Sequence, residues 1–257
     1  MIELNMNPTF LHLGQFEIRY YGLFYVMGFI VAYFMLKYLF NKKIQNQRIE
    51  DLLVYAGIFG ILGARLFYIL VYNLPFYLQN PIEMLMIQHG GLSFHGGLIG
   101  AMIGIYLFAR KNNLKLMDIL DKIVIPFSFA LGLGRIGNFI NQELYGRVTD
   151  VSWCFNFGDG LCRHPSQLYE SFYSFVIFGI LFSLRNKKMK RGVLFAWFLV
   201  LYSALRFITE FFREPDSQLG FIMGITMGQI LCILMFVAGL FMLFKFNKFI
   251  KKNKRKK

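Results

Sequence analysis

Long apolar runs separated by short polar segments make up almost the whole chain. Most of these runs reach about 20 residues, which is the length a helix needs to cross the hydrocarbon core of a bilayer. The runs cover residues 21–40, 51–72, 95–109, 117–140, 166–184, 192–212 and 225–244. The pattern therefore predicts an all-α, polytopic membrane protein with about seven transmembrane helices.

The third run is short, and its polar lead-in, residues 82–94, holds the glycine-rich sequence HGG. Irregular backbone at membrane depth is tolerated only where it is buried in protein or lines a cavity, so we interpret this lead-in as a re-entrant segment. The first run has no cationic stretch before it, which argues against a cleaved signal peptide. We expect a single integral membrane domain over residues 1–257, with an external loop at about 141–165 and a basic cytoplasmic tail at about 245–257.

Composition agrees with this interpretation, because 56% of the residues are hydrophobic, 18% are aromatic and only 16% are charged. These values exclude an ordinary soluble domain. The net charge of +14 by itself suggests a nucleic-acid partner, but its distribution suggests a membrane instead.

Basic residues crowd alternate loops. The crowded segments hold Lys42, Lys43 and Arg48, then Arg110, Lys111 and Lys115, then Arg185, Lys187, Lys188, Lys190 and Arg191, and finally the tail at 245–257. The intervening loops carry only Arg19, Arg147, Arg163 and Arg213. The positive-inside rule then places the amino terminus outside and the carboxy terminus in the cytoplasm. We interpret the tail as an orientation signal that contacts anionic lipids of the bilayer, and we expect no nucleic-acid partner.

Cysteine usage is less informative. Cys154 and Cys162 fall in the predicted external loop, where a disulfide or two free thiols are equally compatible with the sequence. With His164 they match no usual zinc-ligand spacing, so we expect no metal site. Cys232 lies in the last run.

Three arginines lie inside the apolar runs. Arg65, Arg135 and Arg206 each come shortly before the predicted outer end of a helix, roughly 8 to 10 Å below the outer surface. His95 begins another helix at a similar level. An intramembrane ionisable residue is a functional-site hypothesis by default. The alternative is that each arginine extends independently to the interface.

Helical spacing favours a shared polar cavity that opens toward the outer leaflet. Tyr202, Arg206 and Glu210 recur every four residues and therefore share one helix face. Arg206 and Glu210 are then also spaced as a structural ion pair. Arg135 and Asn138 share another helix face, and Glu143 follows in the same polar segment.

A fork of guanidinium groups in a low dielectric is suited to binding phosphate, because each group stays charged and offers paired donors. We therefore predict an anionic phospholipid as the ligand. Gly132, Gly134 and Gly137 allow close approach of helices or head groups, whereas we interpret Gly100 and Gly104 as helix-packing residues. The imidazole of His95 is a candidate base, and its alternative role is to cap the helix start.

Several motifs together resemble one known family. They are YYGLFY (20–25), HGGLSFHGGLIG (89–100), GRIGNFINQELYGR (134–147), HPSQLYES (164–171) and RFITEFFREPD (206–216). In this order they resemble the bacterial phosphatidylglycerol:prolipoprotein diacylglyceryl transferases, and they cover most of the chain. The segment 149–162 is the least similar part.

The resemblance implies a reaction in which the diacylglyceryl group of phosphatidylglycerol moves to the lipobox cysteine of a prolipoprotein signal peptide. It also implies a multi-pass protein of the bacterial cytoplasmic membrane, with its active site near the outer leaflet and no cofactor. By motif, Arg135 binds the lipid phosphate, Arg206 is a second essential cation and His95 is the proposed base. The other positions associated with the site are Tyr21, Asn138, Glu143, Gly146, Tyr202 and Glu210. We add Arg65, because it lies at the same predicted depth as Arg135 and Arg206.

The sequence leaves open the identity of the base and the class of protein. Glu143 is an alternative to His95 as the base, because a carboxylate can also take the proton of a thiol. A transporter for anionic lipids would also need a basic cavity, although the sequence shows no internal repeat of the kind that transporters commonly have. A noncatalytic membrane scaffold would explain the spans but not the clustered charge.

Overall fold

The computed structural model of this chain describes residues 1–4, 6–13, 16–40, 46–214, 221–222 and 225–254. Lys42, Lys43, residues 215–216 of the last motif and residues 255–257 of the tail lie outside these ranges. The chain forms two compact units, one of residues 1–35 and 120–257 and the other of residues 36–119. We call them the arginine-pair unit and the Arg65 unit. The expectation of a single integral membrane domain stays a prediction.

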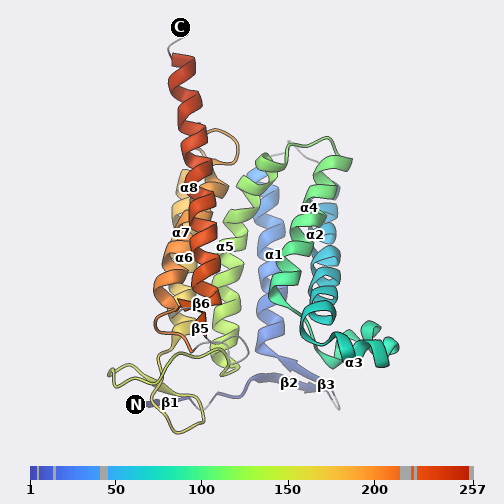
Figure 1. Ribbon diagram of the computed structural model, residues 1–257, viewed down its shortest axis with the longest axis vertical. Helices are drawn as coiled ribbons and strands as arrows, with labels where there is room; N and C mark the ends of the chain where they lie inside the picture. Colours follow the sequence, from blue (N-terminus) through green and yellow to red (C-terminus); the bar gives the residue numbers. More distant parts are fainter. Residues whose placement is uncertain (5, 14–15, 41–45, 215–220, 223–224, 255–257) are drawn as a thin grey trace. The chain divides into compact units, whose positions relative to one another are not determined.

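The fold is mostly helical, as predicted (Figure 1). The α-helices are α1 (Tyr20–Phe40), α2 (Asn46–Phe67), α3 (Leu74–Gln79), α4 (Phe94–Lys111), α5 (Leu116–Ile140), α6 (Ser166–Leu184), α7 (Val193–Thr209) and α8 (Met227–Lys254). A π-helical turn, η1 (Tyr68–Tyr72), continues α2, and two 3₁₀ turns, η2 (Pro81–Leu85) and η3 (Ile87–His89), precede α4.

Within the described ranges, four helices are long and apolar enough to cross a membrane. They cover Tyr20–Phe40, Asn46–Tyr72, Ser166–Leu184 and Met227–Lys245, and α7 is a shorter apolar helix. The helix α5 carries Asp118, Asp121 and Lys122 in its first turns and Arg135 near its end. The helices support a membrane protein, whereas the number of seven spans stays a prediction.

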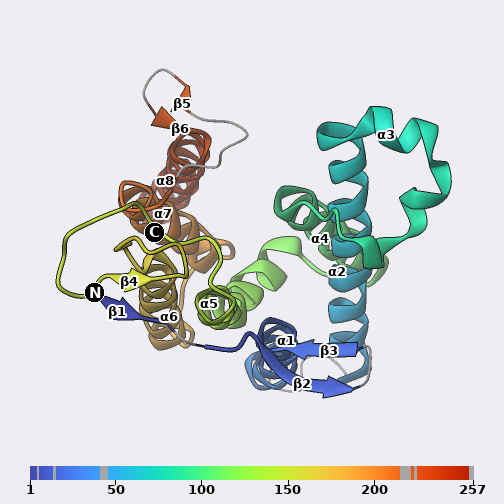
Figure 2. The same ribbon diagram turned by 90° about the horizontal axis from the view of Figure 1, so that it is seen from below.

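Short strand pairs modify the all-α prediction. β1 (Ile2–Glu3) pairs in parallel with β4 (Phe155–Asn156), and β2 (Thr9–Leu13) pairs antiparallel with β3 (Phe16–Arg19). β5 (Phe221–Ile222) and β6 (Ile225–Thr226) form a further antiparallel pair. Figure 2 shows these strands at the ends of the helices of the arginine-pair unit. Strands this short give too few alternating positions for the hydrophobic pattern to reveal them.

In the arginine-pair unit, α5 packs closely against α1 and α6. A Cβ added to Gly132 would lie 2.8 Å from the Phe175 ring, and one added to Gly137 would lie 3.1 Å from Tyr21. The Ser171 hydroxyl also donates to the carbonyl of Gly132 at 2.9 Å. The prediction that Gly132 and Gly137 allow close approach is therefore confirmed, while Gly134 has no such neighbour within 4 Å.

In the Arg65 unit, α2 and α4 pack backbone to backbone. A Cβ at Gly100 would collide with the carbonyl of Phe59, and a Cβ at Gly104 would collide with the carbonyl of Tyr55. Small residues at every fourth position let two helices approach in this way. The interpretation of Gly100 and Gly104 as packing residues is confirmed.

Candidate functional site

The site begins where α5 ends. The backbone N–H of Glu143 donates to the carbonyl of Asn138, and that of Gln142 donates to the carbonyl of Phe139, each at 3.0 Å. Gln142 has a φ of 57°. This is a Schellman end with a left-handed residue after the helix, a position that glycine more often fills. The turn brings Glu143 back along the helix, where its Oε1 accepts from the amide Nδ2 of Asn138 at 2.7 Å.

The first turn of α6 holds this exit in place. Ser166 Oγ donates to the carbonyl of Leu144 at 3.2 Å, and Gln167 Nε2 donates to the carbonyl of Glu143 at 2.8 Å. Ser166 and Gln167 are both fully buried. These residues belong to the HPSQLYES motif, whose function in the fold is therefore to fix the α5 exit against α6.

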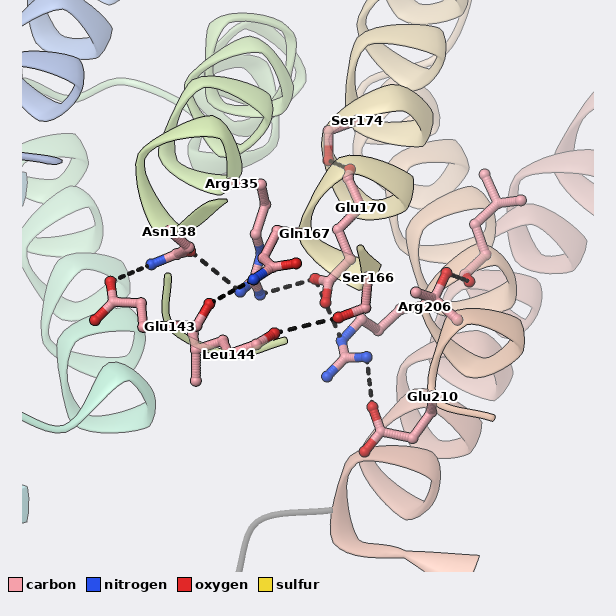
Figure 3. A network of polar contacts seen from close by, with 12 residues as sticks. Arg135, Asn138, Glu143, Leu144, Ser166, Gln167, Glu170, Ser174, Arg206 and Glu210 are labelled. Atoms are coloured by element: carbon pink, nitrogen blue, oxygen red, sulfur yellow. Dashed lines mark hydrogen bonds and ion pairs between the residues drawn. The ribbon is translucent and has the colours of Figure 1, made fainter. Parts of the chain in front are cut away.

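One turn further along α6, Glu170 lies between two guanidinium groups (Figure 3). Its Oε2 is 2.8 Å from Nη2 of Arg135 on α5 and 3.8 Å from Nε of Arg206 on α7. Glu170 is 1% exposed. The structure thus brings Arg135 and Arg206 together, as the sequence predicted, and it does so through a carboxylate that the sequence reasoning missed.

A signal for Glu170 was present in the sequence. It is the only charged residue in α6, and no basic residue lies four positions away on the same helix. A carboxylate in such an apolar helix needs a partner from elsewhere in the fold, because burying an unpaired charge is very costly.

The Arg206 end of the cluster is also paired. Nη1 of Arg206 contacts Oε2 of Glu210, so the predicted ion pair one helical turn apart is confirmed. Oε1 of Glu210 accepts from the Thr226 hydroxyl at 2.9 Å, which joins α7 to the start of α8. Gly228 packs on this carboxylate so closely that a Cβ would lie 2.7 Å from Oε1.

Arg135 is the more accessible of the two cations. Its side chain is 19% exposed, against 10% for Arg206 and 2% for Glu170. Its Nη1 lies 3.4 Å from the Asn138 oxygen, which confirms that these residues share one helix face. Arg135 thus keeps surface for a ligand while its charge is held by Glu170.

Two tyrosines lie beside the cluster. The rings of Tyr202 on α7 and Tyr173 on α6 meet edge to face with their centroids 6.0 Å apart. The buried hydroxyl of Tyr173 has no hydrogen-bond partner within the described part of the chain.

Tyr21 lies on α1, at the Asn138 end of the cluster. The hydroxyl of Tyr21 shares a 2.8 Å hydrogen bond with that of Tyr25 and also interacts with the side chain of Asn138.

Gly146 occupies a crossing of three backbone segments. Its N–H donates to the carbonyl of His164 at 2.9 Å, and Arg147 N–H donates to Phe212 at the same distance. A Cβ at Gly146 would lie 2.6 Å from His164 and collide with the carbonyl of Phe212. Gly146 therefore serves the fold of the loop beside the cluster, whereas contact with substrate stays a prediction.

The loop after α5 carries its own fixed elements. Cys154 and Cys162 form a disulfide, which resolves the two possibilities left by the sequence. Arg163 Nε donates to Asp159 at 2.5 Å. Burial raises the pKa of the Asp159 carboxyl, but hydrogen bonds from Arg163 and the Leu161 N–H outweigh it, so the pKa is lowered overall. Burial lowers the pKa of His164.

Arg65 has different partners, all within its own unit. Its guanidinium donates to the carbonyls of Glu83, Met84, Met86, Gly90 and Gly91. It also lies over the Tyr77 ring, 5.0 Å from the centroid, and the residue is 5% exposed. Arg65 therefore holds the segment between α2 and α4, and its assignment to a lipid site stays a prediction.

His95 also belongs to the Arg65 unit, where it follows the capping residue of α4. The hydroxyl of Ser93 accepts from the Gly96 N–H at 3.4 Å, so Ser93 caps the helix. This assigns the capping role to Ser93 and leaves the imidazole of His95 exposed. A common level for His95, Arg65 and the two arginines of the other unit stays a prediction.

Apolar helices of membrane-spanning length and a pair of guanidinium groups on one buried carboxylate are typical of a helical membrane protein with a site suited to binding an anion. Comparison with known proteins makes this class specific. A family model described as prolipoprotein diacylglyceryl transferase matches residues 8–245. The chain belongs to this family.

Individual relatives match this chain over nearly its full length, and each carries the name phosphatidylglycerol–prolipoprotein diacylglyceryl transferase. The protein from Geobacter sulfurreducens is 44% identical over 93% of this chain and 94% of its own. The protein from Wolbachia pipientis is 43% identical over 92% of this chain and 94% of its own. The protein from Francisella tularensis is 42% identical over 98% and 97%, respectively.

Proposed function

We propose that this chain transfers the diacylglyceryl group of phosphatidylglycerol to the lipobox cysteine thiol of prolipoproteins, the first step of lipoprotein maturation. The observation that carries the proposal is the pair of guanidinium groups from α5 and α7, held on the buried carboxylate of Glu170. The family to which the chain belongs supports the same reaction.

Arg135 binds the phosphate of the lipid, because its side chain has the larger exposed fraction of the two. A planar guanidinium offers paired donors that match phosphate oxygens. Arg206 supplies the second positive charge. The remaining groups assigned to substrate are Tyr21, Asn138, Glu143, Gly146, Tyr202 and Glu210, all in the same unit.

In the transfer step, the sulfur of the lipobox cysteine attacks the glycerol carbon that carries the phosphate ester. A C–S bond forms, the C–O bond breaks, and its electron pair leaves with glycerol phosphate. Negative charge grows on the leaving oxygen as the bond breaks. Preorganised guanidinium groups therefore stabilise the transition state more than the ground state.

The thiol proton goes to a base, for which there are two candidates. Glu143 lies in the same unit as Arg135, and its carboxylate is oriented by the amide of Asn138. His95 has an exposed imidazole at the start of α4. Either group can perform general-base catalysis.

We further propose seven spans in the bacterial cytoplasmic membrane, with α4, α5 and α7 added to the four long apolar helices. The amino terminus and the loop at 141–165 are external, the tail after residue 244 is cytoplasmic, and the site faces the outer leaflet. The distribution of lysine and arginine supports this orientation. In intact cells, an impermeant thiol reagent should leave a reporter cysteine at position 254 unlabelled, and labelling there would overturn the orientation.

The reaction is tested with the purified protein, phosphatidylglycerol vesicles and a lipobox peptide. Mass analysis should show a diacylglyceryl increment on the peptide together with released glycerol phosphate. Movement of lipid between leaflets without a covalent product would instead identify a transporter. If neither transfer nor lipid movement occurs, the result would favour a scaffold. A peptide with serine in place of the lipobox cysteine is the control, and it should gain no mass.

A further inference from the structure

Glu170 contributes a negative charge at the centre of the positive cluster, where it lowers the net charge that a phosphate meets. Arg135 and Arg206 carry two positive charges, and Glu170 and Glu210 pair with them. These four ion-paired groups therefore have a net charge of zero. All four come from one unit, and Figure 3 shows Glu170 between the two guanidinium groups.

The charge of the ligand changes during the proposed reaction. The phosphodiester of phosphatidylglycerol carries one negative charge, whereas a phosphate monoester such as glycerol phosphate carries about −1.5 to −2 near neutral pH. A strongly positive site would therefore bind the product more tightly than the substrate, since Coulomb energy grows with ligand charge. Release of the product would then be slow.

Glu170 also fixes the spacing between the two guanidinium groups. The two guanidinium groups come from different helices, and two like charges repel each other in a low dielectric. A shared carboxylate at 2.8 and 3.8 Å fixes the spacing between them. Its own helix is fixed in turn by Ser166 and Gln167, which bind the α5 exit.

We propose that Glu170 is a positioning residue that holds Arg135 and Arg206 at one spacing and keeps the cluster neutral, so that glycerol phosphate leaves after transfer. The inference rests on the proposed function and extends it to product release. Glu170 acts through the two arginines and does not touch the substrate.

The test compares wild type with Glu170→Gln and Glu170→Asp. Glutamine keeps the shape but removes the charge, so the affinity for glycerol phosphate should rise about 10-fold or more. The single-turnover rate should fall, and repeated turnover should stall after a first burst. Aspartate keeps the charge but is one methylene shorter, so the affinity for glycerol phosphate should stay near that of wild type while the single-turnover rate falls.

Binding of glycerol phosphate is measured by calorimetry on each detergent-purified protein, and folding is checked by size exclusion and thermal unfolding. A folded Glu170→Gln protein with unchanged or weaker affinity would overturn the inference. If that variant does not fold, Glu170→Asp provides the test. A single-turnover rate of the Glu170→Asp protein equal to that of wild type would overturn the inference. Glu214→Gln is the matched control, since Glu214 is half exposed and pairs with Arg163 outside the spans. Wild-type protein without any transfer activity would contradict the proposed function itself.

Discussion

Arg65 and the Arg135–Arg206 pair all lie near the predicted outer ends of helices, yet their side chains have different partners in the fold. Five backbone carbonyls accept from Arg65, so its donors are used by the chain itself. Arg135 and Arg206 instead pair with carboxylates, and Arg135 keeps 19% of its side chain exposed. A guanidinium surrounded by carbonyls supports a segment, whereas a partly exposed guanidinium held by a carboxylate can still bind an anion.

Replacing the base should have the largest effect on the rate. The two candidates for the base, His95 and Glu143, lie in different units. Replacing the true base, by His95→Gln or Glu143→Gln, should lower the single-turnover rate by about 10² to 10⁴-fold, while the other substitution should leave it within a few-fold. The measurement is the rate at saturating phosphatidylglycerol across pH. A His95→Gln protein with an unaltered rate and pH profile would remove His95 from the mechanism, and the same result for Glu143→Gln would remove Glu143.

Arg135→Lys tests the arginine-pair unit directly. An ammonium keeps the charge but cannot make paired contacts to phosphate, so transfer should fall by about 10²-fold. Activity is measured at limiting lipid, with thermal unfolding as the check on folding. Activity equal to that of wild type would contradict a phosphate-binding fork at this position.

Arg65→Lys is the corresponding change in the other unit. A lysine cannot reach all five carbonyls, so the free energy of unfolding should fall by about 2 to 4 kcal/mol. Transfer by the folded fraction should fall only a few-fold. If the folded Arg65→Lys protein loses as much activity as Arg135→Lys, the contrast between the two units is wrong.

The pH dependence of the disulfide-bearing loop gives the smallest expected effect. The folded-state pKa values of His164 and Asp159 are both lowered. Each group therefore stabilises the loop above its unfolded pKa, and this contribution is lost as the pH falls through the folded value. Protection factors against hydrogen exchange, which account for the slower intrinsic exchange at lower pH, should fall for residues 154–164 on acidification, first below about pH 6.5 and again below about pH 4.

Asp159→Asn should remove only the step at lower pH. Protection factors that do not change between pH 7 and pH 4 would contradict both assignments. The activity at neutral pH serves as the control, because neither residue contacts the arginine pair in the structure.

The sequence predicted the helices well because their apolar length is a strong signal, and helical spacing correctly paired Arg206 with Glu210. It did not predict Glu170, because the partners of this carboxylate lie on two other helices. The common depth of Arg65 and the other two arginines stays a prediction. The sequence did not indicate the partners of Arg65, because they are backbone carbonyls, which leave no trace in residue identity.

We expect the arginine pair, and not Arg65, to bind the lipid phosphate. The most direct measurement uses phosphatidylglycerol with a photoreactive head group, followed by mass spectrometry of the labelled peptides. Labelling is expected within residues 134–147 and 202–210. Excess unlabelled phosphatidylglycerol should abolish this labelling, and Arg135→Lys should strongly reduce it. Competed labelling confined to residues 83–91, around Arg65, would contradict this expectation.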